Sequence, residues 1–195
     1  MKTVSFANMI DGSREEYEFI GRNIKRFQGE LGERLLKVMK LLDYDTSGYQ
    51  VTRYEHCLQS ATRAHRDGRE VEYVVAALLH DVGDVIGPFS HAEVTAAIYR
   101  PFISPRICWI VGHHDVFQLY YYGEQMGYDR NARDVFKDHQ WYDDAVEFCE
   151  KYDQNCFGRD YDWEPMEFFQ PMVQQMFARP RYLNEAYPES PYATK

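Results

Sequence analysis

Apolar residues recur at helical spacing along almost the whole chain, whereas the alternation typical of a half-buried strand is nearly absent. We expect helices that begin near residues 13, 31, 52, 71, 91, 104, 138 and 165. The segment 71–81 is almost entirely apolar and could be a buried strand by periodicity alone, but its paired Ala and Leu residues favour a buried helix. The sequence therefore predicts an all-α fold.

Short polar sequences mark several of the expected helix ends. Residues 13–16 and 90–93 each have the Ser-x-x-Glu pattern of a capping box. Ser104 precedes a proline at the first helical position, and the Asp67-Gly68 pair closes the helix of residues 52–66. Gly29 or Gly32 is expected to end the first helix, and Asp138 is expected to cap a helix that reaches residue 153.

The length of 195 residues is enough for one compact domain and too little for two ordinary ones. We expect a single helical domain over residues 1–180, with its core motif at 52–153. Residues 181–195 contain further prolines and few aliphatic side chains, so they are expected to form an extended C-terminal tail.

Charge and hydropathy exclude two classes of partner. The formal net charge is −9, which lacks the basic footprint of broad nucleic-acid binding. The longest apolar run, residues 74–79, is far shorter than a membrane span. The N-terminus lacks the apolar stretch of a secretory signal, so we expect a cytoplasmic protein with free, packed thiols at Cys57, Cys108, Cys149 and Cys156.

The dipeptide His80-Asp81 ends the buried apolar segment and precedes a glycine-bearing loop. An unpaired carboxylate in such a position costs several kcal/mol or more, and a metal ion compensates by pairing with the carboxylate and with neutral imidazole. A helix end whose backbone N–H groups are capped by Asp81 explains the dipeptide equally well.

The order of the other candidate ligands favours the metal. His56 lies upstream, and His91, the His113-His114 pair and Asp153 lie downstream. This order, with YEHCLQSA at residues 54–61 and AALLHDVG at 76–83, resembles the HD-domain superfamily of metal-dependent enzymes. The resemblance covers about half of the chain and implies one HD-type helical bundle with a metal site between its core helices.

Two chemistries occur in that superfamily, namely metal-dependent phosphohydrolysis and oxygenation by a mixed-valent di-iron centre. EHCLQSA at 55–61 and RICWIVGHH at 106–114 look like the hydroxyphosphonate-cleaving branch of the oxygenases, which also include myo-inositol oxygenase. The resemblance implies two iron ions, Fe(II) and Fe(III), with O2 and a small-molecule substrate. It assigns the first metal to His56, His80, Asp81 and Asp153, and the second to Asp81, His91 and His114.

The resemblance leaves one ligand open and points to two candidate substrate contacts. The register from Arg106 favours His114 as the ligand, with His113 as the alternative or as a residue behind the ligands. The relatives' Tyr-x-Gly-Glu lid aligns with residues 46–49, so Tyr49 replaces the Glu, and Gln118 replaces a Lys that meets the phosphonate. Both are candidate substrate contacts, but the lost cation argues against a phosphonate unless Arg130, Lys137 or Arg159 substitutes.

Three functions remain for comparison. A di-iron oxygenase that hydroxylates C–H and cleaves C–C or C–P bonds is favoured, because few cations lie near the ligands in sequence. The alternative is a phosphohydrolase of a nucleotide or phosphomonoester that uses Mn, Mg or another divalent metal. A non-enzymatic HD module is disfavoured because every ligand position is filled. We assign no catalytic role to His65 or His139, and the sequence indicates neither the substrate nor the oligomeric state.

Overall fold

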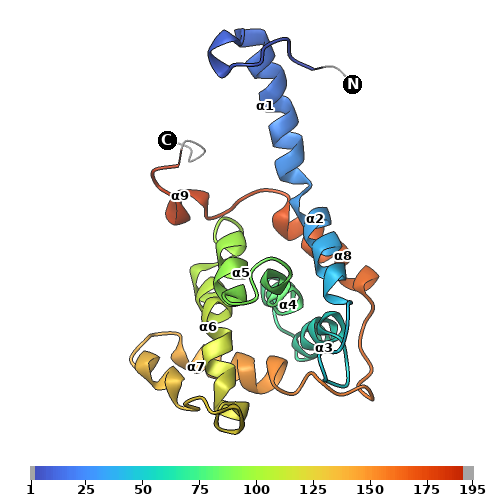
Figure 1. Ribbon diagram of the computed structural model, residues 1–195, viewed down its shortest axis with the longest axis vertical. Helices are drawn as coiled ribbons and strands as arrows, with labels where there is room; N and C mark the ends of the chain where they lie inside the picture. The colour runs from blue at the N-terminus through green and yellow to red at the C-terminus, as the bar shows by residue number, and fades with distance from the viewer. Residues whose placement is uncertain (1–2, 191–195) are drawn as a thin grey trace.

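The computed structural model describes residues 3–190, and within that range it contains helices and turns but no strand, which confirms the all-α prediction (Figure 1). None of the helices within residues 3–190 combines the length and the apolar content needed to cross a membrane. The described α-helices are α1 (Arg14–Gly29), α2 (Leu31–Met39), α3 (Arg53–Arg66), α4 (Val71–Leu79), α5 (His91–Tyr99), α6 (Pro105–Tyr122), α7 (Tyr142–Phe148), α8 (Met166–Phe177) and α9 (Leu183–Ala186).

Helix α4 lies at the centre of the body, with α3, α6 and α8 packed around it (Figure 1). Its residues from Tyr73 to Leu79 are all buried, which explains why the segment is apolar on every face. Each fully buried Leu or Val side chain there stabilises the fold by about 1.5–3 kcal/mol. Both α3 and α4 lead toward the same region, because α3 begins and α4 ends close to the metal-ligand candidates.

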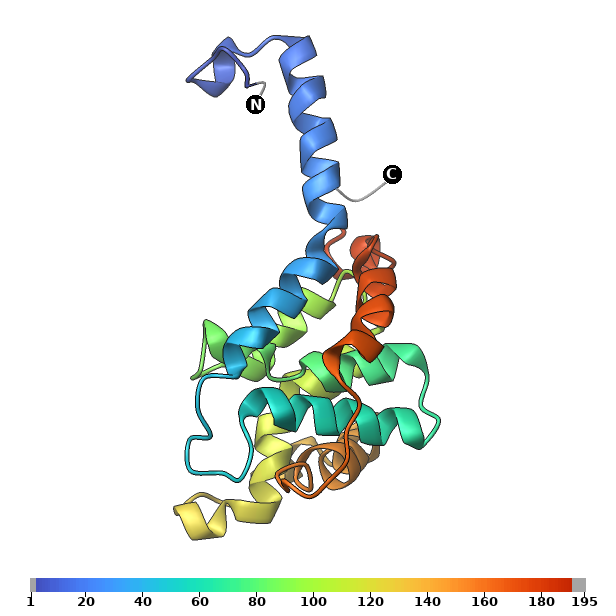
Figure 2. The same ribbon diagram turned by 90° about the vertical axis from the view of Figure 1, so that its right-hand side faces the viewer.

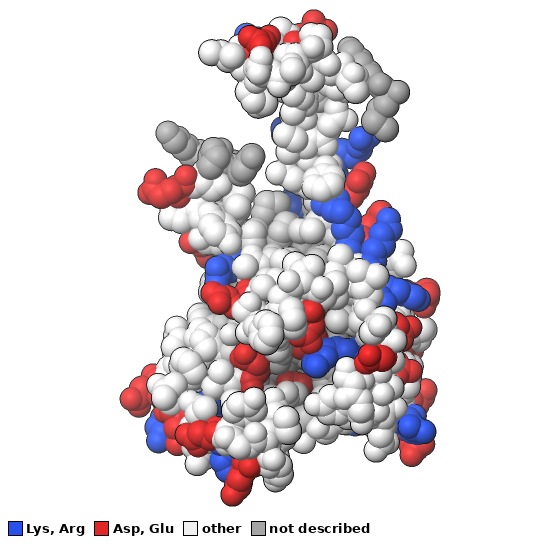
Figure 3. Space-filling model, viewed as in Figure 1, with Lys and Arg blue, Asp and Glu red and all other residues white. Residues whose placement is uncertain are grey.

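Helix α1 projects from the body, and none of its residues is buried (Figures 1 and 2). The predicted capping box is present, with reciprocal contacts between Ser13 and Glu16. Apolar side chains along the helix remain accessible, with Ile24 41% and Phe27 60% exposed. On the face shown in Figure 3, basic side chains gather where α1 passes into α2, while acidic ones are scattered over the body. Local capping and charge therefore support this arm more than core packing does.

Three predicted caps do not form, and the first is Ser104, which precedes α6 without a side-chain capping hydrogen bond. Helix α5 begins at His91 as expected, but Ser90 makes no capping hydrogen bond because its backbone, with φ −149° and ψ 32°, lies outside the capping conformation. Helix α7 begins at Tyr142 rather than at Asp138, and it ends at Phe148, where the chain continues as a π turn, Cys149–Asp153. Residue type alone predicts neither the backbone conformation of Ser90 nor the π turn after α7.

The C-terminal region differs from the expected extended tail. Helix α8 ends at Phe177, and the short helix α9 lies within the segment predicted to be extended. The backbone N–H groups of Arg181 and Tyr182 both donate to the carbonyl of Pro101, which holds this segment against the end of α5. The last part of the expected tail, residues 191–195, lies outside the described residues.

All four cysteines are free and buried, as the sequence predicted for packing residues. Burial raises the pKa of the Cys57 and Cys149 thiols well above its usual value. They are therefore neutral thiols, unsuited to act as nucleophiles.

Gly83 lies in the segment that connects the end of α4 to the start of α5. It lies in the 3₁₀ turn Val82–Val85, and its N–H donates to Thr95 Oγ1 at 3.0 Å. A Cβ at this position would overlap the carbonyl oxygen of His91 and approach Thr95 Oγ1 to 2.9 Å. Only glycine lets the turn approach α5 this closely, which brings His91 toward Asp81.

We expect Gly83→Ala to lower the free energy of unfolding by about 1–3 kcal/mol, because α5 must shift to relieve the overlap. Gly21→Ala is the control, since no described atom lies within 4 Å of its Cβ position in α1. It should be neutral or stabilising by roughly 0.5–1 kcal/mol. Urea denaturation monitored by circular dichroism measures both, and equal effects would contradict the packing argument.

Candidate metal centre

Six side chains from different parts of the chain converge below the end of α4. His56 lies in the first turns of α3, His80 follows the last residue of α4, and His91 is the first residue of α5. Asp81 lies in the loop after α4, His114 lies in the middle of α6, and Asp153 lies at the end of the π turn. Five of the six are at most 2% exposed, and His91 is intermediate.

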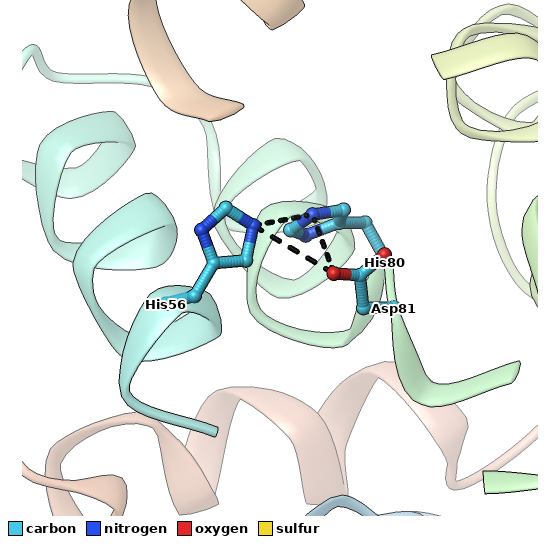
Figure 4. A group of neighbouring side chains, drawn as sticks. All are labelled: His56, His80 and Asp81. Atoms are coloured by element: carbon cyan, nitrogen blue, oxygen red, sulfur yellow. Dashed lines mark hydrogen bonds and ion pairs between the residues drawn. The ribbon is translucent and has the colours of Figure 1, made fainter. Parts of the chain in front are cut away.

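The first half of the cluster contains His56, His80 and Asp153, with one oxygen of Asp81. The Nε2 atoms of His56 and His80 lie 3.1 Å apart, and Asp153 Oδ1 lies 3.3 Å from the first and 3.7 Å from the second. Asp81 Oδ2 lies 3.7 Å and 3.5 Å from the same two nitrogens, and Figure 4 shows this oxygen facing both rings. His56, His80 and Asp81 thus place one donor atom each within 4.8 Å of one another, and so do His80, His114 and Asp153.

The second half uses the other oxygen of Asp81. The Nε2 atoms of His91 and His114 lie 3.2 Å apart, and Asp81 Oδ1 lies 3.4 Å from the first and 3.2 Å from the second. Asp81 therefore presents Oδ2 to one histidine pair and Oδ1 to the other. A carboxylate in this position can bridge two cations.

Backbone carbonyls orient three of the four histidines. A carbonyl oxygen only accepts, so each Nδ1 that contacts one must carry the proton, and the neutral ring then points the Nε2 lone pair into the cluster. The Nδ1-to-carbonyl distances for His56, His80 and His114 are 3.1 Å to Cys156, 2.8 Å to Ala77 and 2.6 Å to Val111.

The donor spacing fits bound metal. Donor atoms about 2.1 Å from one ion lie roughly 3.0–3.5 Å apart in octahedral or tetrahedral geometry. The separations in both halves, 3.1–3.7 Å, are close to that range. Asp153 Oδ2 is buried without a hydrogen-bond partner among the described residues. Imidazole and carboxylate donors suit iron, manganese or zinc, so these residues could hold two such ions.

The cluster's charges are strongly coupled. Burial by itself would raise the pKa of Asp81, but His80 and Arg53 hold it well below its usual range. Burial by itself would lower the pKa of His114, but its hydrogen bond to Asp81 and that carboxylate's charge raise it to about 9. The metal-free site therefore favours a proton on His114, and a metal ion must displace it.

The other histidines lie outside the cluster. His113 points away from it, donates Nδ1–H to the Trp109 carbonyl at 2.7 Å and stacks on the Trp109 ring. His139 also stacks on the Trp109 ring, with ring centroids 3.9 Å apart, and His65 meets Phe168 edge-on with centroids 4.9 Å apart. Of the two adjacent candidates, the structure brings His114 to the site.

The two candidate substrate contacts have different surroundings. Gln118 lies one turn after His114 and donates an amide hydrogen to Asp153 Oδ1, so it orients a ligand. Tyr49 is half exposed and stacks on Phe157, which in turn stacks on His56 at 4.3 Å. Tyr49 therefore covers the first half of the cluster through an aromatic neighbour.

The cations expected to replace the missing Lys are placed elsewhere. Arg130 pairs with Glu124, Lys137 pairs with Asp134, and the structure gives Arg159 no contact with the six side chains within residues 3–190. Within residues 3–190, the cation that pairs with the cluster is Arg53, through Asp81.

Sequence reasoning missed the roles of Arg53 and Asp84. Arg53 lies three residues before His56, and Asp84 lies three residues after Asp81. Helical or turn spacing from the assigned ligands was the signal that could have found both. The guanidinium of Arg53 contacts Asp81 Oδ2 and Asp84 Oδ2, each at 3.0 Å.

Residues 53–137 match the family model of the HD domain. This match covers less than half of the chain. The chain is also 33% identical over 89 residues to 1-hydroxy-2-(trimethylamino)ethylphosphonate dioxygenase (glycine-betaine-forming) from Leisingera caerulea. The match covers 40% of this chain and 45% of that protein, so it spans less than half of the relative's length. The HD-superfamily resemblance inferred from the sequence is thus confirmed, and the HD domain contains every ligand candidate except Asp153.

We expect Asp81→Ala to remove both metals, because it deletes the oxygens that face both histidine pairs. His56→Ala should remove only the first, and His65→Ala should retain both. Elemental analysis of protein loaded with ferrous iron measures the content. Full metal content in Asp81→Ala would contradict the bridging role.

Metal binding should release protons at pH 7.5. The pKa of His114 is raised to about 9 in the metal-free chain, so this ring is protonated at pH 7.5 and must lose a proton to use Nε2 as a ligand. Apparent affinity should therefore rise with pH up to about 9. Calorimetric titration in buffers of different ionisation enthalpy counts the protons, and a pH-independent affinity would contradict this assignment.

Proposed function

We propose that this protein is a di-iron oxygenase that uses O2 to oxidise or cleave a small polar organic molecule. The observation that carries the proposal is Asp81, whose two oxygens each face a separate histidine pair at 3.2–3.7 Å. Two adjoining cation positions that share a carboxylate suit chemistry in which two metals act together. The relative's dioxygenase activity supports O2 chemistry over hydrolysis.

Bound iron would supply the activation of O2 and a position at which substrate oxygens chelate. The chain's own residues divide the work between the two halves. His56, His80 and Asp153 are almost fully buried, and Phe157 and Phe148 pack against the rings of the two histidines, which excludes water from this half.

The second half is the more accessible one. It has three protein ligands rather than four, and the side chain of His91 is 18% exposed. A substrate can therefore reach the positions that Asp81, His91 and His114 leave open. Holding the substrate there, beside the buried half, fixes its orientation and lowers the entropic cost of reaction.

The reaction class follows from the relative. Its printed activity acts on a hydroxylated phosphonate that carries a trimethylamino group. We propose C–H hydroxylation followed by C–C or C–P cleavage for this chain, on a substrate with adjacent oxygens that can chelate. We further propose a cytoplasmic location, which the four free thiols support.

The test is iron content and electron paramagnetic resonance. Protein purified aerobically from iron-supplemented cells should carry about two irons per chain. Partial reduction should give a coupled Fe(II)/Fe(III) signal that shifts on adding 1-hydroxy-2-(trimethylamino)ethylphosphonate or myo-inositol, with O2 consumed when the added compound is a substrate.

A metal-dependent phosphohydrolase is the competing outcome, because HD domains also support that chemistry and Arg53 places one cation at the cluster. Chain loaded mainly with manganese or magnesium, with phosphatase activity on p-nitrophenyl phosphate and no O2 uptake, would replace the oxygenase proposal with the hydrolase.

A further inference from the structure

His91 is oriented differently from the other three histidines of the cluster. Their Nδ1 atoms contact backbone carbonyls, whereas His91 Nδ1 lies 3.4 Å from Asp84 Oδ1. This distance is slightly longer than a hydrogen bond. Within residues 3–190, Asp84 is the polar partner that the structure gives to His91 Nδ1. This ring is also the most exposed of the four, so packing restrains it least.

Asp84 is in turn held by Arg53. The Nε atom of Arg53 lies 3.0 Å from Asp84 Oδ2, while its terminal nitrogen donates to Asp81 Oδ2 at the same distance. The guanidinium fork thus spans two carboxylates, one within the metal cluster and one behind it. A planar fork fixes both partners in a way that a lysine ammonium cannot.

The backbone places both residues firmly. Arg53 is the first residue of α3, directly after Thr52, whose capping box with Glu55 is complete. Asp84 lies in the turn that Gly83 docks against α5. Neither side chain depends on a mobile loop for its position.

We propose that Asp84 is a positioning residue for His91, that Arg53 holds Asp84 in place, and that this pair maintains the half of the metal centre formed with His91 and His114. The inference rests on the proposed function only in requiring two metals. Carboxylates that accept from the distal nitrogen of a ligating histidine fix its tautomer and orientation.

Asp84 acts behind the ligand rather than as one. It meets His91 at Nδ1, whereas Nε2 of the same ring faces Asp81 Oδ1 at 3.4 Å. Because the two nitrogens lie on different sides of the imidazole, a cation held at Nε2 has the ring between itself and Asp84 Oδ1. The Asp84 carboxylate can therefore accept the Nδ1 proton without entering the cluster.

The experiment compares Asp84→Asn and Arg53→Gln with wild type. Ferrous iron is titrated into each metal-free protein, and elemental analysis and electron paramagnetic resonance follow the two positions. We expect the second iron to bind about 10–100-fold more weakly in both variants, with loss of the coupled signal while the first iron is retained. Asp84→Glu, which keeps the carboxylate, should recover part of the affinity.

Arg106 and Asp144 supply a matched control. They also form an Arg–Asp pair between helices, and the Arg106 side chain is 38% exposed, the same as Arg53. Arg106→Gln and Asp144→Asn should leave both irons bound. A loss of the second iron in these controls would show that any broken ion pair of this kind has the effect, and would overturn the inference.

The double variant tests the order of action. If Arg53 acts through Asp84, Arg53→Gln should weaken the second iron little further when Asp84→Asn is already present. If Asp84→Asn binds two irons with wild-type affinity, the positioning role of Asp84 is wrong but the proposed function stands. If that variant also loses turnover, Asp84 contacts the substrate instead. Fewer than two irons in the wild type would overturn the proposed function as well.

Discussion

The burial of the Asp81 carboxylate is the constraint on which the site depends. Asp81 comes shortly after helix α4, whose last seven residues are buried, and Asp81 itself is only 2% exposed. A carboxylate in that environment is costly unless charges and hydrogen-bond donors surround it. Arg53 and the histidines from α3, α5 and α6 supply them, so this one carboxylate links residues from three helices.

The two halves of the cluster differ in solvation, and this difference governs what each can do. The half with His56 and His80 lies under Phe157 and Phe148, where water is excluded and donor geometry is fixed by packing. In the other half, His91 is 18% exposed and its Nδ1 faces a side chain, Asp84, whereas His114 is held by the Val111 carbonyl. A rigid buried half beside an accessible one suits a centre that keeps one metal and offers the other to substrate.

Residue type and spacing predicted the capping box at Ser13, because such boxes are local interactions within four residues, but the box predicted at Ser90 does not form and the one at Thr52 was not predicted. The six ligand candidates were identified by their order along the chain, and the structure brings all six together. The choice between His113 and His114 required the helix's rotation, and the ion pairs of Arg53 join residues 28 or more positions apart. Such long-range contacts depend on tertiary packing that no local pattern encodes.

The structure shows what Gln118 does at the position where the relatives have a lysine. Its amide donates to Asp153 Oδ1, the oxygen that faces both buried histidines, so this side chain serves a ligand. The cation at the cluster, Arg53, already has two carboxylate partners at 3.0 Å. An anionic group on the substrate would therefore find its compensating charge at the metal ions themselves rather than at a side chain of the described cluster. Under the proposed function, chelation by adjacent substrate oxygens would then be the main source of recognition, which favours small, oxygen-rich molecules over those identified by a distant phosphate.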